Sequence, residues 1–220
     1  MADELVRTAY QARAAEYTGL LGSVEDMHEL DRLRIEQWAD RIGGAVLDVG
    51  CGPGHWTDLL HRRGVDVQGI DLVPEFIDAA RTRFPDVPFR VASFRDLGVP
   101  DGSLHGVLAW YSLIHVHPDE LPAVFSEIAR ALARGGHLLL GFFEGSAAEP
   151  FAHAVTTAYY WSIDQMRQML LGAGFDVLDV QTRQDPGRRP HAAIAAVVKD
   201  RPAGNSPSSG AGARQVGPVV

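Results

Sequence analysis

Three things are scarce in this sequence: cysteine, positive charge and long apolar runs. Cys51 is the single cysteine among 220 residues, so no disulfide can form within the chain. The net charge of −8 and the lack of any Lys/Arg run argue against nucleic acid or an anionic membrane as the main partner. No stretch reaches membrane-spanning length, and the first residues lack an apolar secretory core. We therefore expect a cytoplasmic protein without a nucleic-acid or membrane partner.

The composition is otherwise balanced: 46% of the residues are hydrophobic and 22% are charged, which fits one domain with an adequate core. We expect this domain to span residues 1–200. From residue 201 the sequence turns to Gly, Ser and Pro, which predicts a disordered tail over 201–220. At the other end, residues 1–41 suggest two amphipathic helices, 3–21 and 25–41.

From residue 45 onward, apolar runs alternate with stretches of helical periodicity, which predicts an α/β fold. Strands are expected near residues 45–49, 65–70, 88–92, 106–111, 136–143, 175–181 and 192–198. Helices are expected near residues 54–63, 75–83, 119–133 and 163–171. Ser162 and Gln165 have the spacing of a capping box at the start of the last of these helices.

The most informative segment is AVLDVGCGPGHW, residues 45–56, which has the pattern of a buried strand, a glycine turn and the start of a helix. Such a unit makes a nucleotide-sized crevice at the carboxyl end of the strand. A dinucleotide fingerprint needs G-x-G-x-x-G, but here Gly54 comes one position early and His55 stands where Gly or Ala is needed. Asp48, just before the turn, would repel a pyrophosphate and suit an ammonium group. The segment therefore disfavours a nicotinamide cofactor and favours a cationic ligand.

A second acid, Asp71, falls at the carboxyl end of the next predicted strand. It lies 21 residues after Gly50 (71 − 50), close to the spacing of roughly 20 residues expected for an acid that binds ribose hydroxyls. A carboxylate at this place can accept two hydrogen bonds from a vicinal diol.

Five ordered segments resemble the motifs of the class I S-adenosylmethionine-dependent methyltransferases, of the small UbiE-like kind. They are VLDVGCGPG, GIDLVPEFIDAAR, VPDGSLHGVLAWYSLIHV, LARGGHLLL and SIDQMRQMLLGAGFDVLDV. The resemblance implies a Rossmann-like three-layer sandwich around a mostly parallel seven-stranded sheet that ends in an antiparallel hairpin. It also implies that the chain is an enzyme with S-adenosylmethionine as its cofactor and a small-molecule acceptor.

The resemblance assigns cofactor contacts residue by residue. Gly50 and Gly52 would line the methionine moiety, Asp48 would help hold its amine, and Asp71 would bind the ribose. The adenine would meet Leu72, with Ser93 where the family often has an acid. The remaining expected cofactor contacts are Phe94 and Trp110.

Methyl transfer from a sulfonium is an in-line displacement, so positioning and desolvation can supply most of the rate. A base matters only if the acceptor must lose a proton. His115, after the fourth strand, is our candidate for a base or a substrate-orienting group; the alternative is that it only bonds a loop backbone. His117 lies two residues on, but no third ligand is spaced with this pair, so no metal site is expected.

The segment 142–161 is too aromatic for an ordinary connection and follows the fifth strand, over the mouth of the cofactor site in this fold. It suggests a lid that stacks on the acceptor, or else a cap on the sheet or a dimer contact. The helices in 1–41 would close the other side of the pocket. The residues expected to touch the acceptor are Tyr17, Tyr111, His115, Phe143, His153 and Tyr160.

Three alternatives remain open at this point: a methyltransferase for protein or another macromolecule, an oxidoreductase, and a noncatalytic module that binds S-adenosylmethionine. The sequence does not identify the acceptor, the atom that is methylated or whether the protein is a monomer or a homodimer. Secondary metabolism is one setting in which such an O- or N-methylation could take place.

Overall fold

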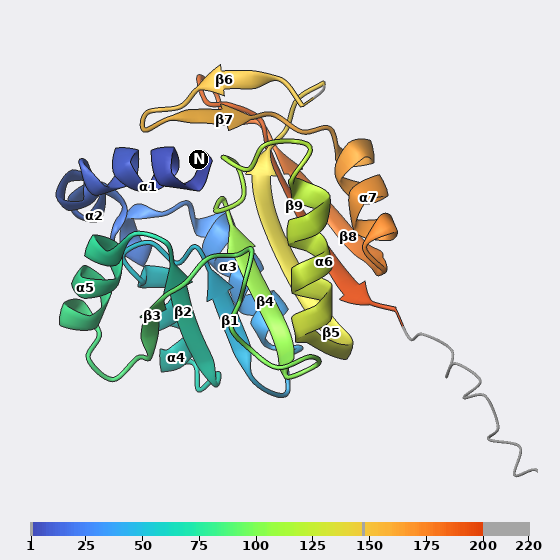
Figure 1. Ribbon diagram of the computed structural model, residues 1–220, viewed down its shortest axis with the longest axis horizontal. Coiled ribbons are helices and arrows are strands. Elements are labelled where there is room, and N and C mark those ends of the chain that lie inside the picture. Colours follow the sequence, from blue (N-terminus) through green and yellow to red (C-terminus); the bar gives the residue numbers. More distant parts are fainter. Residues whose placement is uncertain (1, 147, 200–220) are drawn as a thin grey trace, which may run out of the picture.

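The computed structural model describes residues 2–146 and 148–199 (Figure 1). In this part of the chain seven strands form one sheet, in the order β3-β2-β1-β4-β5-β9-β8. β1 to β5 run parallel, whereas β9 is antiparallel to both β5 and β8. The predicted mostly parallel sheet with an antiparallel terminal hairpin is therefore confirmed. The strand bounds are β1 Val46–Val49, β2 Val67–Asp71, β3 Phe89–Val91, β4 Leu104–Trp110, β5 Leu132–Phe143, β8 Phe175–Arg183 and β9 His191–Val198.

Helices cover both faces of the sheet, as its apolar strands require. α3 and α4 pack with Val46 and Leu108, whereas α6 and α7 pack with Leu47 and Val107. Neighbouring residues of a strand point to opposite faces, so runs that are apolar throughout bury both faces at once. The result is the predicted three-layer sandwich. The helix bounds are α3 Glu29–Ala39, α4 His55–Arg62, α5 Pro74–Arg83, α6 Leu121–Ala131 and α7 Ile163–Gly172.

The start of α7 is held by the predicted capping box. The hydroxyl of Ser162 accepts a hydrogen bond from the backbone N–H of Gln165 at 3.2 Å, and the Gln165 side chain bonds back to the Ser162 backbone. These two bonds pair donors that the first turn of a helix leaves free.

The prediction of one helix over residues 3–21 is wrong, because the chain forms α1 Ala2–Gln11 and α2 Ala14–Leu21. The break brings the rings of Tyr10 and Tyr17 to 5.6 Å, with Phe76 of α5 within 5.8 Å of both. In a continuous helix these tyrosines would be about 10.5 Å apart along the axis. The predicted helix 25–41 is likewise divided, into the 3-10 turn η1 Val24–Asp26 and α3.

A two-stranded ribbon, β6 Pro150–Ala152 and β7 Thr157–Tyr159, lies within the aromatic segment and was not predicted. Figure 1 shows this ribbon at the same end of the molecule as α1 and α2, beyond the carboxyl ends of the parallel strands. The strand order reverses between β1 and β4, and in such sheets the ligand crevice lies at that reversal. Segments from both ends of the domain therefore meet over the expected site.

Two other expectations concern the ends of the chain and the membrane. The predicted disordered tail, 201–220, lies outside the described residues. Within 2–146 and 148–199 the helices are too short or too polar to cross a membrane.

Candidate functional site

The three glycines of the turn after β1 have different reasons to be glycine. All have positive φ, 71° at Gly50, 53° at Gly52 and 86° at Gly54. A Cβ on Gly50 would lie 2.3 Å from the Cβ of Ser112, and one on Gly54 would lie 2.7 Å from the ring of Phe89. A Cβ on Gly52 would meet nothing within 4 Å. Gly50 and Gly54 thus permit close packing, and Gly52 alone leaves open space beside the backbone.

Asp71, at the end of β2, is tied to the glycine turn. One carboxylate oxygen accepts the backbone N–H of Gly52 and the other that of Val73, both at 2.9 Å. Burial raises the pKa of Asp71 to about 6, although these backbone bonds act in the opposite direction. Each oxygen keeps a second lone pair, so the group can still accept hydrogen bonds from a ligand.

Asp48 faces α4 from inside the core. It is 2% exposed, and one of its oxygens accepts the hydroxyl of Thr57 at 2.6 Å. Burial raises the pKa of Asp48 to about 7, and the negative charge of Asp71 acts in the same direction. Two neighbouring acids that are both hard to ionise form a site that a cation would stabilise.

Aromatic side chains of α1, α2 and α5 stand above Asp71. Tyr10, Tyr17 and Phe76 contact one another edge to face or tilted. The pKa of Tyr10 is raised well above its ordinary value by burial and by the charges of Tyr17 and Asp71, so the phenol keeps its proton. The pKa of Tyr17 is raised by burial and by the charge of Asp71.

His115 has hydrogen-bond partners on both ring nitrogens. Nδ1 lies 2.7 Å from the carbonyl oxygen of Thr157 in β7, and Nε2 lies 2.8 Å from the hydroxyl of Tyr10. A carbonyl only accepts, so Nδ1 carries the proton, and Nε2 accepts the proton of the phenol. Burial lowers the pKa of His115, which favours this neutral form.

His153, in the turn between β6 and β7, stands against the other side of His115. The two rings are 5.2 Å apart, and Phe143 lies 6.2 Å from His153. Nδ1 of His153 is buried and has no hydrogen-bond partner among the described residues. Burial lowers its pKa to about 4, and the charges of His115, Arg189 and Arg13 act in the same direction. Three of the residues predicted to touch the acceptor therefore come together.

Two arginines fasten the β6–β7 ribbon from outside. Arg13, between α1 and α2, donates to the carbonyl of Ala154. Arg189, before β9, stacks on the ring of Phe151 at 4.6 Å and donates to the hydroxyl of Tyr160 at 3.1 Å. Tyr160 itself stacks on Phe151 at 4.3 Å, so this predicted acceptor residue belongs to the outer part of the cluster.

The loop after β3 carries two further predicted cofactor residues. The hydroxyl of Ser93 accepts the backbone N–H of Arg95 at 3.1 Å, which fixes the turn. The ring of Phe94 is partly buried against the core and has the guanidinium of Arg95 5.5 Å from its centroid. Leu72, between Asp71 and the start of α5, is partly exposed and free to meet a ligand face.

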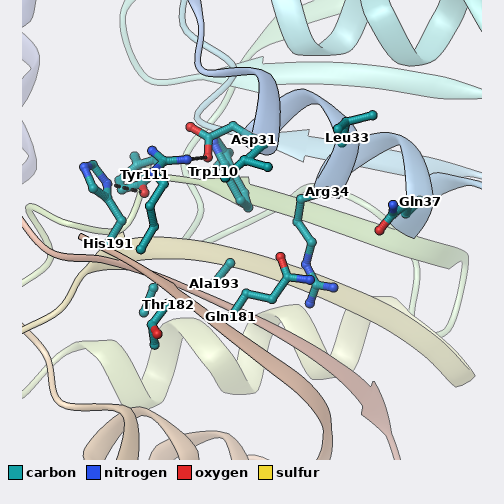
Figure 2. A pocket seen from close by; sticks show the side chains of 13 residues that line it. Asp31, Leu33, Arg34, Gln37, Trp110, Tyr111, Gln181, Thr182, His191 and Ala193 are labelled. Carbon is teal, nitrogen blue, oxygen red and sulfur yellow. Dashed lines mark hydrogen bonds and ion pairs between the residues drawn. The ribbon is translucent and has the colours of Figure 1, made fainter. Parts of the chain in front are cut away.

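At the end of β4 three consecutive side chains go to different places. Trp110, expected at the cofactor, packs on the α3 side and lines a cleft there (Figure 2). Tyr111 has φ 54°, and its hydroxyl lies 2.6 Å from Nδ1 of His191. Only Ser112 meets the glycine turn, with a buried hydroxyl that has no partner among the described residues.

Comparison with known proteins identifies the architecture around this turn. A family model described as a methyltransferase domain matches residues 46–136, from β1 into β5. A ubiquinone biosynthesis O-methyltransferase of Xanthomonas campestris pv. campestris is 37% identical over 147 residues, 63% of this chain and 60% of the relative. Residues 46–136 thus match a methyltransferase domain, and the chain is similar to the class I S-adenosylmethionine-dependent methyltransferases.

Solved structures agree with this methyltransferase fold. The 1,6-didemethyltoxoflavin-N1-methyltransferase of Burkholderia thailandensis has a TM-score of 0.71 at 20% identity, covering 88% of both chains. The [4+2]-cyclase SpnF has a TM-score of 0.72 at 20% identity and covers 90% of this chain and 97% of its own. At such identities the likeness shows the fold alone. The chain spans about 60% of the length of the curated relatives it matches.

The residues of this site fit S-adenosylmethionine, the cofactor that class I methyltransferases use. The backbone at Gly52 is open to a ligand, and Ser112 and Glu75 each have a buried side-chain oxygen without a partner among the described residues. The acids Asp48 and Asp71 suit a ligand that carries positive charge. In the described part of the chain no three His, Cys, Asp or Glu side chains cluster as metal ligands would.

Three contributions to this candidate site were not predicted. Thr57 bonds Asp48, Phe76 supports both tyrosines, and Arg189 holds the ribbon.

Proposed function

We propose that this methyltransferase transfers a methyl group from S-adenosylmethionine to an oxygen or nitrogen of a small-molecule acceptor by in-line displacement. One observation carries the proposal: Tyr10 adjoins Asp71 and donates to His115, so one wall joins the proposed cofactor site to the proposed base. The names of the Xanthomonas and Burkholderia relatives support a small-molecule acceptor. The proposal includes an acceptor from secondary metabolism.

The cofactor would supply a methyl group that its sulfonium already activates. We propose that Gly50 and Gly52 admit the methionine moiety, that Asp71 accepts ribose hydroxyls, and that Asp48 contributes negative charge behind the turn. Leu72 would cover the adenine, with Ser93 and Phe94 at its edge. Of the predicted cofactor contacts, Trp110 takes no part in this proposal, because its side chain lies on the α3 side.

Tyr10 and His115 together can remove a proton from the acceptor. The phenol oxygen of Tyr10 donates to Nε2 of His115 and still has lone pairs that can accept the acceptor O–H or N–H. As the acceptor is methylated, its proton passes to the Tyr10 oxygen and the phenol proton passes to His115, which becomes an imidazolium. Thr157 holds the ring through Nδ1 and so fixes which nitrogen receives the proton.

The acceptor is proposed to lie between the tyrosines of the N-terminal helices and the β6–β7 ribbon. Tyr17, Phe143 and His153 offer it ring faces, and Tyr160 and Tyr111 support the cluster from behind. Such walls exclude water, and desolvation of the acceptor raises its reactivity toward a cationic methyl donor.

The test is transfer of a labelled methyl group from S-adenosylmethionine to a metabolite extract, in parallel with a protein extract. Label in small molecules is expected; label confined to protein, or binding without any transfer, would contradict the proposal. With an acceptor in hand, His115→Ala should lower kcat by about a hundredfold or more, as expected for a lost proton acceptor. His117→Ala is the matched control, since His117 is exposed and its ring meets only Tyr159 among the described rings. Equal effects of the two substitutions would refute the role of His115.

A further inference from the structure

A second cleft lies on the α3 side of the sheet, between α3 and the β8–β9 hairpin (Figure 2). It has a volume of about 190 Å³. Among the residues assigned above to cofactor or acceptor, only Trp110 and Tyr111 line it. Tyr111 contacts both His191 of the cleft and Phe143 of the acceptor cluster, so the two sites share one wall.

Arg34 is the unusual residue of this cleft. It reaches from α3 toward Gln181 of β8, and it is only 8% exposed (Figure 2). Its Nη1 pairs with Asp179 at 2.6 Å, but its Nε and Nη2 are buried without a partner in the described part of the chain. A buried guanidinium N–H without an acceptor is costly, so this arrangement is incomplete.

The two unpaired N–H groups of Arg34 indicate which ligand would complete its hydrogen bonding. Nε and Nη2 form one edge of the planar guanidinium, with two parallel N–H bonds that match the two oxygens of a carboxylate. Arg183, the other arginine of the lining, already has carboxylates of Asp31 and Asp185 at 2.6 and 2.8 Å. Asp31 is the one acid that lines the cleft, and its carboxylate is already paired with Arg183.

The rest of the lining suits an apolar body attached to that carboxylate. Trp110 and Tyr111 present rings, Ala192 and Ala193 lie on β9, and Leu30 of α3 is 55% exposed. We propose that this cleft binds a small aromatic carboxylate, with its two oxygens on Nε and Nη2 of Arg34 and its ring against Trp110. The site is separate from the methyl-transfer site and does not depend on the function proposed above.

Benzoate and its neutral analogue benzamide are suitable probes, and their binding can be followed by ligand-observed NMR and by tryptophan fluorescence, with Trp110→Phe to identify the signal of Trp110. We expect benzoate to bind and benzamide to bind at least tenfold more weakly. Arg34→Gln should weaken benzoate at least tenfold, and Arg34→Lys should also weaken it, because lysine keeps the charge and loses the planar edge. Arg32→Gln is the control, on the same helix but outside the lining. Equal affinity for the two probes, or unchanged binding by Arg34→Gln, would overturn the proposal.

Two further measurements separate the cleft from folding and from the methyl-transfer site. Arg34→Gln should bind S-adenosylhomocysteine as the unmodified chain does; if the unmodified chain does not bind it, the proposed function fails and the benzoate result still stands. Asp179→Asn keeps Arg34 and removes the carboxylate that competes for it, so benzoate should bind more tightly. If Asp179→Asn instead binds benzoate more weakly, the cleft does not use the guanidinium as proposed.

Discussion

Replacement of Asp71 by asparagine should separate the cofactor role of this acid from its role in the fold. Both of its oxygens accept backbone N–H groups, from Gly52 and Val73 at 2.9 Å each. An amide has only one oxygen, so its NH₂ group must face one of these two donors. Asparagine also removes the charge from the two bonds proposed for the ribose. At the lower value of about 1.5 kcal/mol for each bond, the loss is about 3 kcal/mol, roughly a hundredfold in Kd.

Calorimetric titration with S-adenosylhomocysteine measures this loss, and Asp66→Asn is the matched control. Asp66 is exposed and lies just before the same strand, at its other end. The control should bind as the unmodified chain does. If Asp71→Asn binds within about threefold of it, less than 1 kcal/mol, the ribose role of Asp71 is refuted.

The pH dependence provides a second reading of the same residue. Burial raises the pKa of Asp71 to about 6, so the carboxylate is lost as the pH falls from 7.5 to 5. Affinity for S-adenosylhomocysteine should fall over this range in the unmodified chain. Asp48 titrates nearby, with a pKa of about 7, and changes the affinity of both proteins. The informative quantity is therefore the difference in affinity between the unmodified chain and Asp71→Asn at each pH. If that difference does not change with pH, the charge on Asp71 does not contribute to binding.

The other two predictions concern stability. Burial raises the folded-state pKa of Asp48 from 3.8 to about 7, so the stability that its protonated form gives is present below pH 3.8 and is lost as the pH rises through 7. Asp48→Asn, which keeps an acceptor for Thr57, should therefore raise the unfolding temperature at pH 8 by an amount that shrinks toward pH 4; a difference independent of pH would contradict this. Gly54→Ala should cost about 2–4 kcal/mol in chemical denaturation, since it adds a clash with Phe89 to the strain of positive φ. Gly52→Ala should cost only about 1–2 kcal/mol of stability, from that strain alone. It should nevertheless weaken S-adenosylhomocysteine binding more than Gly54→Ala does. If Gly54→Ala weakens binding more, the open side of the turn is not at Gly52.

The sheet and its covering helices were predictable because their signals are local. Apolar runs mark strands that are buried on both faces, and the spacing of Ser162 and Gln165 marked the start of α7. The break between α1 and α2 was missed because it is caused by tertiary contacts, the packing of Tyr10 and Tyr17 on Phe76. The ribbon β6–β7 was missed because strands of three residues are too short to show a period.

The candidate site was predictable only in part, for a related reason. Glycines and acids at fixed spacing indicate a cofactor crevice, but the spacing does not say which glycine faces the ligand. Gly54 is explained by Phe89, which follows it by 35 residues (89 − 54) and meets it only in the fold. Likewise, nothing beside His115 in sequence indicates that Tyr10 would occupy its Nε2.

The distribution of these residues explains why family membership does not identify the acceptor. The family model ends at residue 136 and begins at 46, so it contains the glycine turn, Asp71 and His115. The rings that contact His115 come from outside that range, Tyr10 from α1 and His153 from the segment after β5, and Phe143 in turn contacts His153. In the proposed function, the part of the fold that the family model matches would supply the cofactor cradle and one imidazole, while the flanking segments would set the orientation of that imidazole and the shape of the space beside it. Acceptor specificity can therefore change in this architecture without any change in the residues by which the family is recognised.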